Sequence, residues 1–411
     1  MNREPNNREK PLNLWIMAGE ASGDIYGAAL AQDVVRRCRA EGRAVHIGGM
    51  GGPAMAAAGV DRTVDSTELG VIGIIEILRN IFTFIGIYRK LVRTVKAERP
   101  DAVVLIDYPT FHLMFAKVLY KLKIPVVWYV SPHVWVWGKR RIPKLAKLCR
   151  KMLVIFPFEP EIYASSGLDT EFVGHPLIDM VEARRDPTVG RDPNLVVLLP
   201  GSRSMEIKYL LFPMLATVAE LHRKHPELRF VLSAPRERTA ARCREGISRW
   251  RRRHPRAELP EIPVETGKTA YYQQAAGTGL AASGTVTVES AAAGLPLVVV
   301  YRLNYLTLAI FGLCVKLFRN AFTMVNIIAD KPVFEEFLQW KVRPELLVPA
   351  LERILPGGPE RPRVEREMRE VRELLGGGDA PGRLRASERA AAAVLGVIDG
   401  IQSAPANGEK R

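Results

Sequence analysis

Cysteine is scarce in this 411-residue sequence, and the four that occur are widely separated. None belongs to a CxxC pair or to a Cys/His spacing that would hold a metal. We therefore expect free thiols in a reducing compartment. Residues 1–11 are polar and charged, and the apolar run after them has only the length of a strand, so no signal peptide is expected. These features predict a cytoplasmic protein.

An Asp-x-Asp pair and an internal repeat are also missing from the sequence. The first absence removes the carboxylate pair that commonly clamps a metal on a nucleotide-sugar, and we expect neither a metal nor another cofactor. The second argues against a solenoid. Positive charge, in contrast, is abundant, with a net charge of +15. This excess favours an anionic partner, which could be nucleic acid, an anionic membrane face or a phosphorylated substrate.

Two segments of the chain share one build, in which an apolar strand leads through a Gly/Ser turn into a helical pattern. They are residues 14–24 and 195–203. Small residues let backbone N–H groups at a helix N-terminus approach an anion closely, and the helix dipole adds about half a positive charge there. Each segment is therefore a candidate site for phosphate or sugar oxygens. The alternative is a tight turn between strand and helix.

Apolar strand-length runs alternate with helical patterns in both halves, which predicts two doubly wound, Rossmann-like parallel sheets of the α/β class, facing each other across a cleft. We place the first domain at residues 12–183 and the second at 194–380, because charge and proline cluster between them. By analogy with related folds, a helical run at 383–402 can pack back on the first domain, and 403–411 is expected to be a disordered tail. The predicted strands are 14–18, 44–47, 102–106, 126–130, 151–155, 171–173, 195–199, 229–232, 279–282 and 297–301.

A carboxylate directly follows the predicted strand at 102–106. Ligands of doubly wound sheets bind beyond the carboxyl ends of the strands, so Asp107 is expected to point into the site, where it could deprotonate a hydroxyl. The alternative role is a helix cap or a loop brace. Glu20, Ser22 and Asp24 carry the same ambiguity, because Ser and Asp also cap helices. Capping and ligand binding are compatible roles.

Aromatic and imidazole side chains follow two later strands of the first half. Ser131, His133 and Trp135 come after one strand, and His175 comes after the last. Aromatic faces suit sugar rings or acyl chains, so these residues are candidates for the acceptor side of a site. The alternative is that Trp135 and Trp137 anchor a loop in the core.

Phosphate-binding candidates follow two strands of the second half. Arg203 lies beside Ser202, where a guanidinium can hold a pyrophosphate. The triplet Ser283-Gly284-Thr285 precedes a helical run, and Glu289 follows Thr285 by about one helical turn. This spacing lets the triplet meet a phosphate while Glu289 reaches a ribose diol. Arg203 and helix dipoles would have to stabilise a leaving diphosphate where no metal does.

The segment 71–94 has more apolar surface than a helix needs to dock on a sheet. Internal charges at Glu76 and Arg79 argue against a bilayer span. Basic residues crowd 139–151, which favours contact with an anionic membrane surface. The alternatives are burial on several sides or a homodimer contact. The predicted membrane patch consists of Ile74, Ile77, Leu78, Ile81, Phe82 and Ile85.

An ordered series of motifs from about residue 14 to 339 resembles the lipid-A-disaccharide synthases, which are inverting glycosyltransferases of the two-Rossmann GT-B fold. The matching motifs are Ala18–Asp24, Val71–Gly73 with Glu76, Ile106–Pro109, Tyr129–Pro132 with Trp135 and Trp137, Phe156–Glu159, Phe172–Pro176, Leu199–Arg203 with Glu206, Ala282–Thr285 with Glu289, and Asn326 with Glu336 and Gln339. Two triplets depart from the family pattern. An acidic residue and Asn usually flank the Phe where this chain has Thr110-Phe111-His112, and Leu-Pro-Asn is usual where it has Met324-Val325-Asn326.

The resemblance implies transfer of 2,3-diacylglucosamine from its UDP donor to the 6-hydroxyl of 2,3-diacylglucosamine 1-phosphate (lipid X). The products would be UDP and the β-1,6-linked disaccharide precursor of lipid A, made at the anionic cytoplasmic face of the inner membrane for outer membrane biogenesis. Asp107 would be the general base, grouped with Glu20 and Ser22. The acceptor side would comprise Gly19, Asp24, Ser131, His133, Trp135 and His175. UDP would be held by Ser202, Arg203, Ser283, Gly284, Thr285, Glu289 and Asn326.

Other interpretations of the sequence stay open. One is another UDP-sugar enzyme of the same architecture, either a lipid-linked GlcNAc transferase or a UDP-GlcNAc 2-epimerase. The wide apolar face at 71–88 argues against the epimerase, whose substrate is soluble. A second is a non-catalytic protein that binds a membrane surface or nucleic acid through its +15 charge. No recognised nucleic-acid motif supports the latter, so we expect no nucleic-acid partner.

Overall fold

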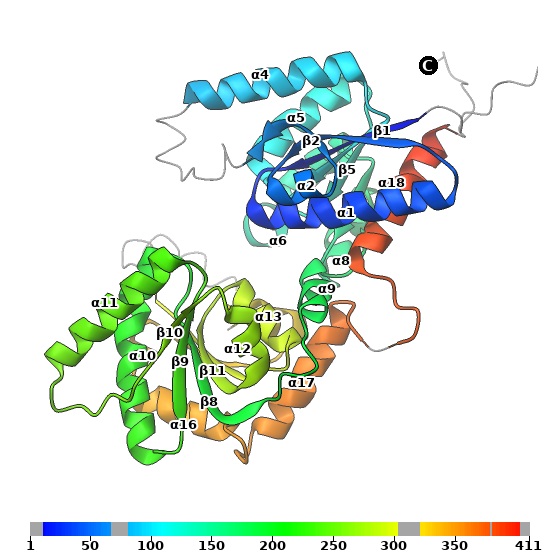
Figure 1. Cartoon of the computed structure of the whole chain (residues 1–411). Helices are drawn as coiled ribbons and strands as arrows, with labels where there is room; N and C mark the ends of the chain where they lie inside the picture. The colour runs from blue at the N-terminus through cyan, green and yellow to red at the C-terminus, as the bar shows by residue number, and fades with distance from the viewer. Residues whose placement is uncertain (1–10, 67–80, 303–320, 379, 403–411) are drawn as a thin grey trace, which may run out of the picture. The chain divides into compact units, whose positions relative to one another are not determined.

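A computed structural model of the chain describes residues 11–66, 81–302, 321–378 and 380–402. Internal contacts divide the protein into two units, one of residues 1–176 with 379–411 and the other of residues 177–378. Each unit is a parallel β-sheet flanked by helices (Figure 1). The predicted α/β class with two doubly wound parallel sheets is therefore confirmed. The division falls just before the charged and proline-rich stretch that separates the domains in the sequence.

The first unit contains, within the described residues, a seven-stranded sheet in the order β3-β2-β1-β4-β5-β6-β7. All of its strand pairs are parallel. The direction of strand addition reverses between β1 and β4, which makes their carboxyl ends the topological switch point where such sheets bind ligands. The strands are β1 (Leu12–Ala18), β2 (Val45–Gly51), β3 (Asp61–Asp65), β4 (Ala102–Ile106), β5 (Val126–Tyr129), β6 (Lys151–Val154) and β7 (Asp169–Phe172).

Helices cover both faces of this sheet. On one face α4, α5 and α7 supply the apolar side chains of the core, and on the other α18 packs along α1 (Figure 1). The described helices of this unit are α1 (Ala21–Ala40), α2 (Pro53–Ala57), α4 (Ile81–Glu98), α5 (Pro109–Lys121), α6 (Val134–Trp137), η2 (Lys139–Arg141), α7 (Ile142–Leu148), α8 (Glu159–Tyr163), η3 (Ala164–Ser166) and α18 (Ala386–Gln402).

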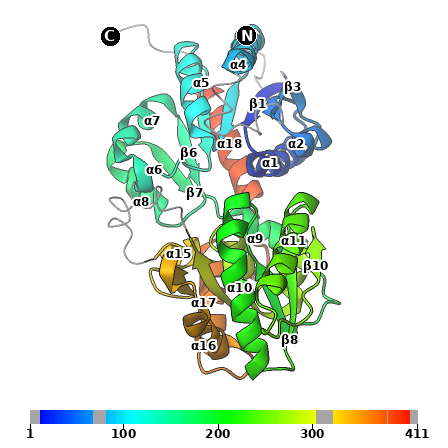
Figure 2. The same cartoon turned by 90° about the vertical axis from the view of Figure 1, so that its left-hand side faces the viewer.

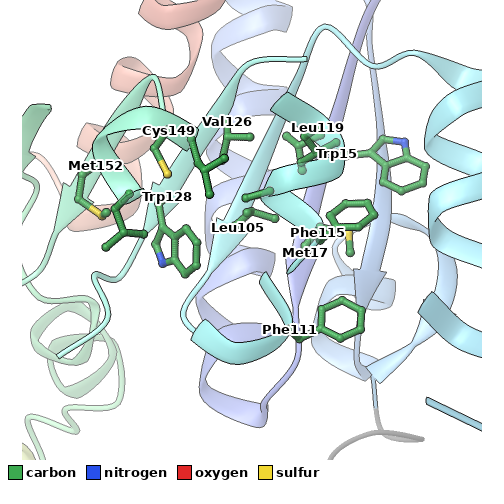
Figure 3. Packing of buried hydrophobic residues seen from close by; sticks show 14 of the residues in the cluster. Trp15, Met17, Leu105, Phe111, Phe115, Leu119, Val126, Trp128, Cys149 and Met152 are labelled. Carbon is green, nitrogen blue, oxygen red and sulfur yellow. The ribbon is translucent and has the colours of Figure 1, made fainter. Parts of the chain in front are cut away.

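The core of the first unit follows the two-residue alternation of its strands. Trp15 and Met17 of β1 lie on the face that Phe111 and Phe115 of α5 cover (Figure 3). All four side chains are at most 1% exposed. Deleting a buried aromatic of this kind costs about 3–5 kcal/mol of folding free energy. The core therefore fixes α5, and with it the turn between β4 and α5, against the sheet.

The C-terminal helix belongs to the first unit. Arg43 pairs with Asp399 at 2.8 Å, and Arg36 pairs with Glu388 at 2.9 Å. Arg385 also pairs with Asp33, a nearly buried carboxylate of α1, at 2.9 Å. These ion pairs join α18 to α1 and to the turn that follows it.

The second unit has, over its described part, a six-stranded sheet in the order β10-β9-β8-β11-β12-β13, with parallel pairing throughout. Its switch point lies between β8 and β11. The strands are β8 (Asp192–Leu199), β9 (Arg229–Ala234), β10 (Val264–Thr266), β11 (Ala276–Ala282), β12 (Leu297–Tyr301) and β13 (Glu335–Leu338). The sequence did not predict β3, β10 or β13, each of which is a short strand at the edge of its sheet.

Two helical layers enclose the second sheet. One contains α10, α11 and α16, and the other contains α12, α13 and α17 (Figures 1 and 2). The basic stretch 236–256 falls largely on α11, which buries Ile247 and Trp250 and exposes the arginines of its last turn. The helices are α9 (Pro176–Ala183), α10 (Ser204–Lys224), α11 (Glu237–Arg253), α12 (Thr269–Ala275), α13 (Thr285–Ala292), α15 (Met324–Ala329), η4 (Gln339–Lys341), α16 (Pro344–Ile354) and α17 (Arg361–Leu374).

None of the helices among the described residues combines the length and apolar composition that crossing a bilayer requires. Of the predicted membrane patch, Ile74, Ile77 and Leu78 lie outside the described residues, as does the predicted tail at 403–411.

Candidate active site

The switch point of the first sheet brings together the turn after β1 and the turn after β4. Ala18 and Ile106, the last residues of these strands, are paired neighbours. Glu20 and Ser22 are exposed at the start of α1, and Asp107 is half-buried directly after β4. Burial raises the pKa of Asp107 above 3.8, while the backbone N–H of Tyr108 opposes the rise. A carboxylate with a raised pKa at this edge is suited to accept a proton.

The backbone at Asp107 is strained. Asp107 and Tyr108 both have φ of 48°, in the left-handed region that non-glycine residues rarely adopt. Such residues cost about 1–3 kcal/mol each and persist only where the surroundings hold them. The Asp107 N–H donates to the Tyr129 carbonyl at 3.0 Å, which ties the turn to β5. Strained residues cluster at functional sites, so this turn is a candidate part of the site.

The carboxylate of Asp24 is buried and has a structural role. It accepts hydrogen bonds from the backbone N–H groups of Gly52 at 2.7 Å, Ala54 at 2.9 Å and Met55 at 3.0 Å. It therefore caps the N-terminus of α2 from a distant part of the chain. The sequence grouped Asp24 with the acceptor-side residues, and the structure places its oxygens on α2 instead.

Aromatic rings gather beyond the carboxyl ends of β5 and β6. The Phe156 and Phe158 rings stack at 5.6 Å, and the His133 and Trp135 rings meet edge to face at 5.6 Å. His175 lies edge-on to Phe156 at 5.4 Å, and burial lowers the His175 pKa to about 3. Three of the predicted acceptor-side residues therefore lie in one aromatic cluster. The sequence offered Phe156 and Phe158 only as part of a family motif and did not predict them as site residues.

Ser131 belongs to a buried polar group. Its hydroxyl is 2.7 Å from the Tyr163 hydroxyl and donates to the Pro132 carbonyl at 3.0 Å. Glu159 accepts a hydrogen bond from the Phe156 N–H at 3.0 Å. Burial raises the Glu159 pKa to about 7. Ser131 and Glu159 thus fix the loop that carries the aromatic rings.

A cavity of about 780 Å³ opens at the switch point of the second sheet. Its size suits a nucleoside diphosphate. Most of the predicted donor-binding residues line it, together with Gln273 on α12, which the sequence did not single out. The lining residues used below are Ser202, Arg203, Glu206, Gln273, Ser283, Gly284, Thr285 and Glu289.

The two helix N-termini at this cavity differ in what they offer an anion. At α10, the Glu206 carboxylate accepts from the backbone N–H groups of Ser202 at 2.9 Å and Arg203 at 3.1 Å, so a negative charge already lies at this end. At α13, the N-cap is Gly284, which has no side chain to form a cap hydrogen bond. The N-terminus of α13 is therefore the better phosphate site of the two. Arg203 contributes a side chain that is 80% exposed.

Glu289 lies one turn into α13 and is held by a neighbouring amide. The buried Gln273 Nε2 is 3.4 Å from Glu289 Oε2 and 3.2 Å from the Ser290 hydroxyl. The carboxylate is half-buried and faces the cavity lined by Gln273. This arrangement suits a carboxylate that accepts hydrogen bonds from a ribose diol.

Asn326 lies outside the set of residues that line the cavity. Its Oδ1 accepts from the Phe334 N–H at 2.9 Å, and its Nδ2 donates to the Phe334 carbonyl and to Glu336 Oε1, both at 2.8 Å. Glu336 also accepts from the Thr323 N–H at 2.8 Å. The side chain of Asn326 therefore joins α15 to β13, and its polar atoms are used within the protein.

The exposed side of α4, α5 and α7 is apolar and basic. Phe82 is 84% exposed, and Ile85 and Met114 are also exposed. The Tyr88 hydroxyl donates to the Met114 carbonyl at 3.2 Å, which joins α4 to α5. The exposed basic residues near them are Lys90, Arg93, Lys117, Lys121, Lys139, Arg140, Arg141, Lys144 and Lys147.

Comparison with known proteins decides the family. A model of the family described as lipid-A-disaccharide synthetase matches residues 14–379. The chain belongs to the lipid-A-disaccharide synthase family. It is 36% identical to the lipid-A-disaccharide synthase of Trichlorobacter lovleyi over 384 residues, covering 91% of this chain and 96% of that one. It is also 36% identical to that of Koribacter versatilis over 393 residues, covering 94% and 98%.

Membership makes the protein a glycosyltransferase of lipid A biosynthesis. Solved structures agree on the fold alone, because their sequences are distant. The Staphylococcus aureus MnaA–UDP structure has a TM-score of 0.62 at 11% identity, covering 97% of this chain and 100% of that one. A putative UDP-N-acetylglucosamine 2-epimerase from Listeria monocytogenes has a TM-score of 0.60 at 13% identity, covering 98% and 100%.

Proposed function

We propose that this chain transfers 2,3-diacylglucosamine from UDP to the 6-hydroxyl of 2,3-diacylglucosamine 1-phosphate. The acceptor oxygen attacks the anomeric carbon, the bond from that carbon to the diphosphate oxygen breaks, and UDP leaves with the bonding pair. Asp107 takes the hydroxyl proton. A single displacement of this kind inverts the anomeric centre and gives a β-linked disaccharide.

The proposal rests on the groups found at the two switch points: a candidate base in the first sheet and a candidate anion site in the second. In the first sheet, the half-buried Asp107 with its raised pKa follows β4. In the second, an uncapped helix N-terminus and Arg203 line the same cavity. The first arrangement suits proton removal from a hydroxyl, and the second suits a leaving diphosphate. Each lies where its sheet topology binds ligands.

UDP is assigned to the cavity of the second unit. The N–H groups at the start of α13 and the Ser283 and Thr285 hydroxyls hold the diphosphate, and Arg203 adds a charge-assisted hydrogen bond. Glu289, steadied by Gln273, accepts from the ribose hydroxyls. These donors are in position before the reaction, so they stabilise the charge that develops on the leaving group.

The acceptor is assigned to the first unit. Glu20 and Ser22 stand at the same strand edge as Asp107 and can bind sugar hydroxyls. The aromatic cluster of His133, Trp135 and Phe158 offers ring faces to a sugar or an acyl chain. Gly19 and Asp24 have structural roles beside this site. Gly19 leaves room for the Tyr108 ring, and Asp24 caps the N-terminus of α2.

The lipid substrates are reached at an anionic membrane surface. The exposed Phe82 and Ile85 supply apolar contact, and each nearby Lys or Arg adds about 1 kcal/mol of attraction to an anionic leaflet. Desolvation and the neighbouring Lys117 and Arg141 lower the pKa of Lys144, which reflects the crowding of positive charge there. This surface favours peripheral binding at the cytoplasmic face of the inner membrane.

Product analysis tests the proposed reaction. The purified protein is incubated in detergent micelles with UDP-2,3-diacylglucosamine and 2,3-diacylglucosamine 1-phosphate, and the lipid product is examined by mass spectrometry and NMR. A β-1,6 disaccharide is expected, and none with the 6-deoxy acceptor, which lacks the nucleophile. A product formed equally from the 6-deoxy acceptor would contradict the proposal. Epimerisation of UDP-GlcNAc would favour the alternative enzyme class.

A further inference from the structure

A buried histidine holds the carbonyl group of Asp107. His112 lies in the first turn of α5 and is 0% exposed. Its Nδ1 is 2.7 Å from the Asp107 carbonyl oxygen. Because a carbonyl only accepts, Nδ1 must carry the hydrogen, which fixes the neutral tautomer with a bare Nε2. Within the described part of the chain, Nε2 has no hydrogen-bond partner.

The ring of His112 is itself held by aromatic neighbours. It meets Tyr108 edge to face at 5.8 Å and Trp128 at 6.0 Å. Full burial lowers the His112 pKa to about 4, so the ring is neutral at physiological pH and its hydrogen bond persists. The same burial keeps the ring away from any bound substrate. An effect of His112 on the reaction must therefore pass through the residues it touches.

The Asp107 turn needs such a contact because its conformation is unfavourable. Asp107 and Tyr108 are consecutive left-handed residues, and neither is glycine. Hydrogen bonds hold the peptide groups on both sides of the Asp107 Cα: the Asp107 N–H donates to the Tyr129 carbonyl, and the Asp107 carbonyl accepts from His112. Loss of one contact frees the turn to relax toward an ordinary conformation, which would swing the Asp107 side chain.

We propose that His112 is a positioning residue, whose Nδ1–H locks the left-handed Asp107 turn and so aims the Asp107 carboxylate at the acceptor hydroxyl. This rests on the proposed role of Asp107 as the general base. His112 is one of the residues at which the sequence departs from the family pattern. The positioning role also explains why a polar ring is kept in an otherwise apolar core.

Three variants of His112 and Asp107 test the proposal. His112→Leu keeps the bulk and removes the donor, and His112→Asn restores a donor, because Asn Nδ2 and His Nδ1 are equally far from Cβ in bonds. Asp107→Asn is made alone and together with His112→Leu. His222→Leu, a histidine whose ring faces Phe230 in the second unit, is the matched control. Thermal unfolding and UDP binding are measured for each to confirm folding.

The expected result is a drop in kcat of about 100-fold for His112→Leu, as for other misplaced catalytic groups, with an unchanged KM for the UDP donor. His112→Asn should recover at least a tenfold part of this loss, and His222→Leu should keep the rate. In the double variant, His112→Leu should add nothing to Asp107→Asn, because it acts through Asp107. Imidazole ¹⁵N NMR should find His112 as the Nδ1–H tautomer.

Two kinetic results would overturn this inference while leaving the proposed general base in place. They are a His112→Leu enzyme of wild-type kcat beside an inactive Asp107→Asn, and losses that multiply in the double variant. An Nε2–H tautomer would also overturn it, and this measurement needs no variant to fold. If Asp107→Asn itself keeps the rate, the proposed general base fails instead, and the inference falls with it.

Discussion

The Tyr108 ring lies against Gly19 so closely that a Cβ atom on Gly19 would stand 2.3 Å from Tyr108 Cδ1. The turn after β1 and the turn after β4 are thus packed on each other at the switch point of the first sheet. Tyr108 also adjoins Asp107 in the chain. Burial raises the pKa of Tyr108, and the negative charge of Glu20 raises it further. The proposed general base therefore has a neighbourhood set by both turns.

Replacing the Asp107 carboxylate should nearly abolish turnover. We expect Asp107→Asn to lower kcat by about 10³-fold, within the range that general bases contribute. UDP binding should be unchanged, because the residues that line the cavity assigned above to UDP belong to the second unit. Single-turnover kinetics and calorimetric titration with UDP measure the two quantities. Asp169→Asn, an exposed carboxylate paired with Lys151, is the control. A variant of wild-type rate would remove Asp107 from the mechanism.

The pH profile should report the ionisation of Asp107. A general base works only when ionised, so kcat/KM should fall as pH drops through its pKa. Burial raises that pKa, so the acid limb should lie above the ordinary Asp value of 3.8. The profile is measured in detergent micelles over the range in which the protein stays folded. An acid limb that persists unchanged in the residual activity of Asp107→Asn would belong to another group.

Arg203 should act on the leaving diphosphate and on little else. Its side chain is 80% exposed, and its nearest carboxylate contact, with Glu206, is 3.4 Å long. We expect Arg203→Ala to lower kcat by about 10–100-fold with an unchanged Tm, and Arg203→Lys to fall between, because Lys keeps the charge without the guanidinium fork. Arg249→Ala on α11 is the control. A lower Tm with an unchanged kcat would assign Arg203 a structural role instead.

The exposed apolar residues of α4 should carry membrane binding. Phe82 and Ile85 point away from the core that Ile87 and Leu91 enter. Replacing both by Ser should release the protein from vesicles that contain anionic lipid, measured by co-sedimentation. Trp340→Ser is the matched control, since Trp340 is 74% exposed in the second unit. Undiminished sedimentation of the double variant, or equal loss in the control, would count against this surface.

The sequence predicted the strands with long apolar runs, and it missed three of the four edge strands of the two sheets, since only β7 was predicted. Val103 and Val104 in β4 are buried on both faces, so their segment reads as a continuous apolar run. In contrast, β3 is Asp61–Asp65 and begins and ends on a charged residue, because an edge strand is partly in water. The α/β class and the central strands therefore followed from the sequence, whereas the strand order and most of the edge strands did not.

The roles within the site were less predictable than its location. Asp24 and Asn326 have side chains that suit a ligand, yet their partners are backbone groups of α2 and Phe334. These partners lie 30 and 8 residues away, and no local pattern reveals them. The same holds for Gln273 beside Glu289, which depends on how α12 meets α13. Local spacing identifies polar groups at strand ends, whereas their hydrogen-bond partners depend on tertiary packing.

The most direct test of the account is acceptor-dependent release of UDP. The purified protein is given UDP-2,3-diacylglucosamine in detergent micelles with EDTA, with and without 2,3-diacylglucosamine 1-phosphate, and free UDP is measured over time. The account predicts release that requires the acceptor, persists in EDTA and is lost in Asp107→Asn. A protein that binds UDP but releases none in response to the acceptor, with or without added magnesium, would contradict it.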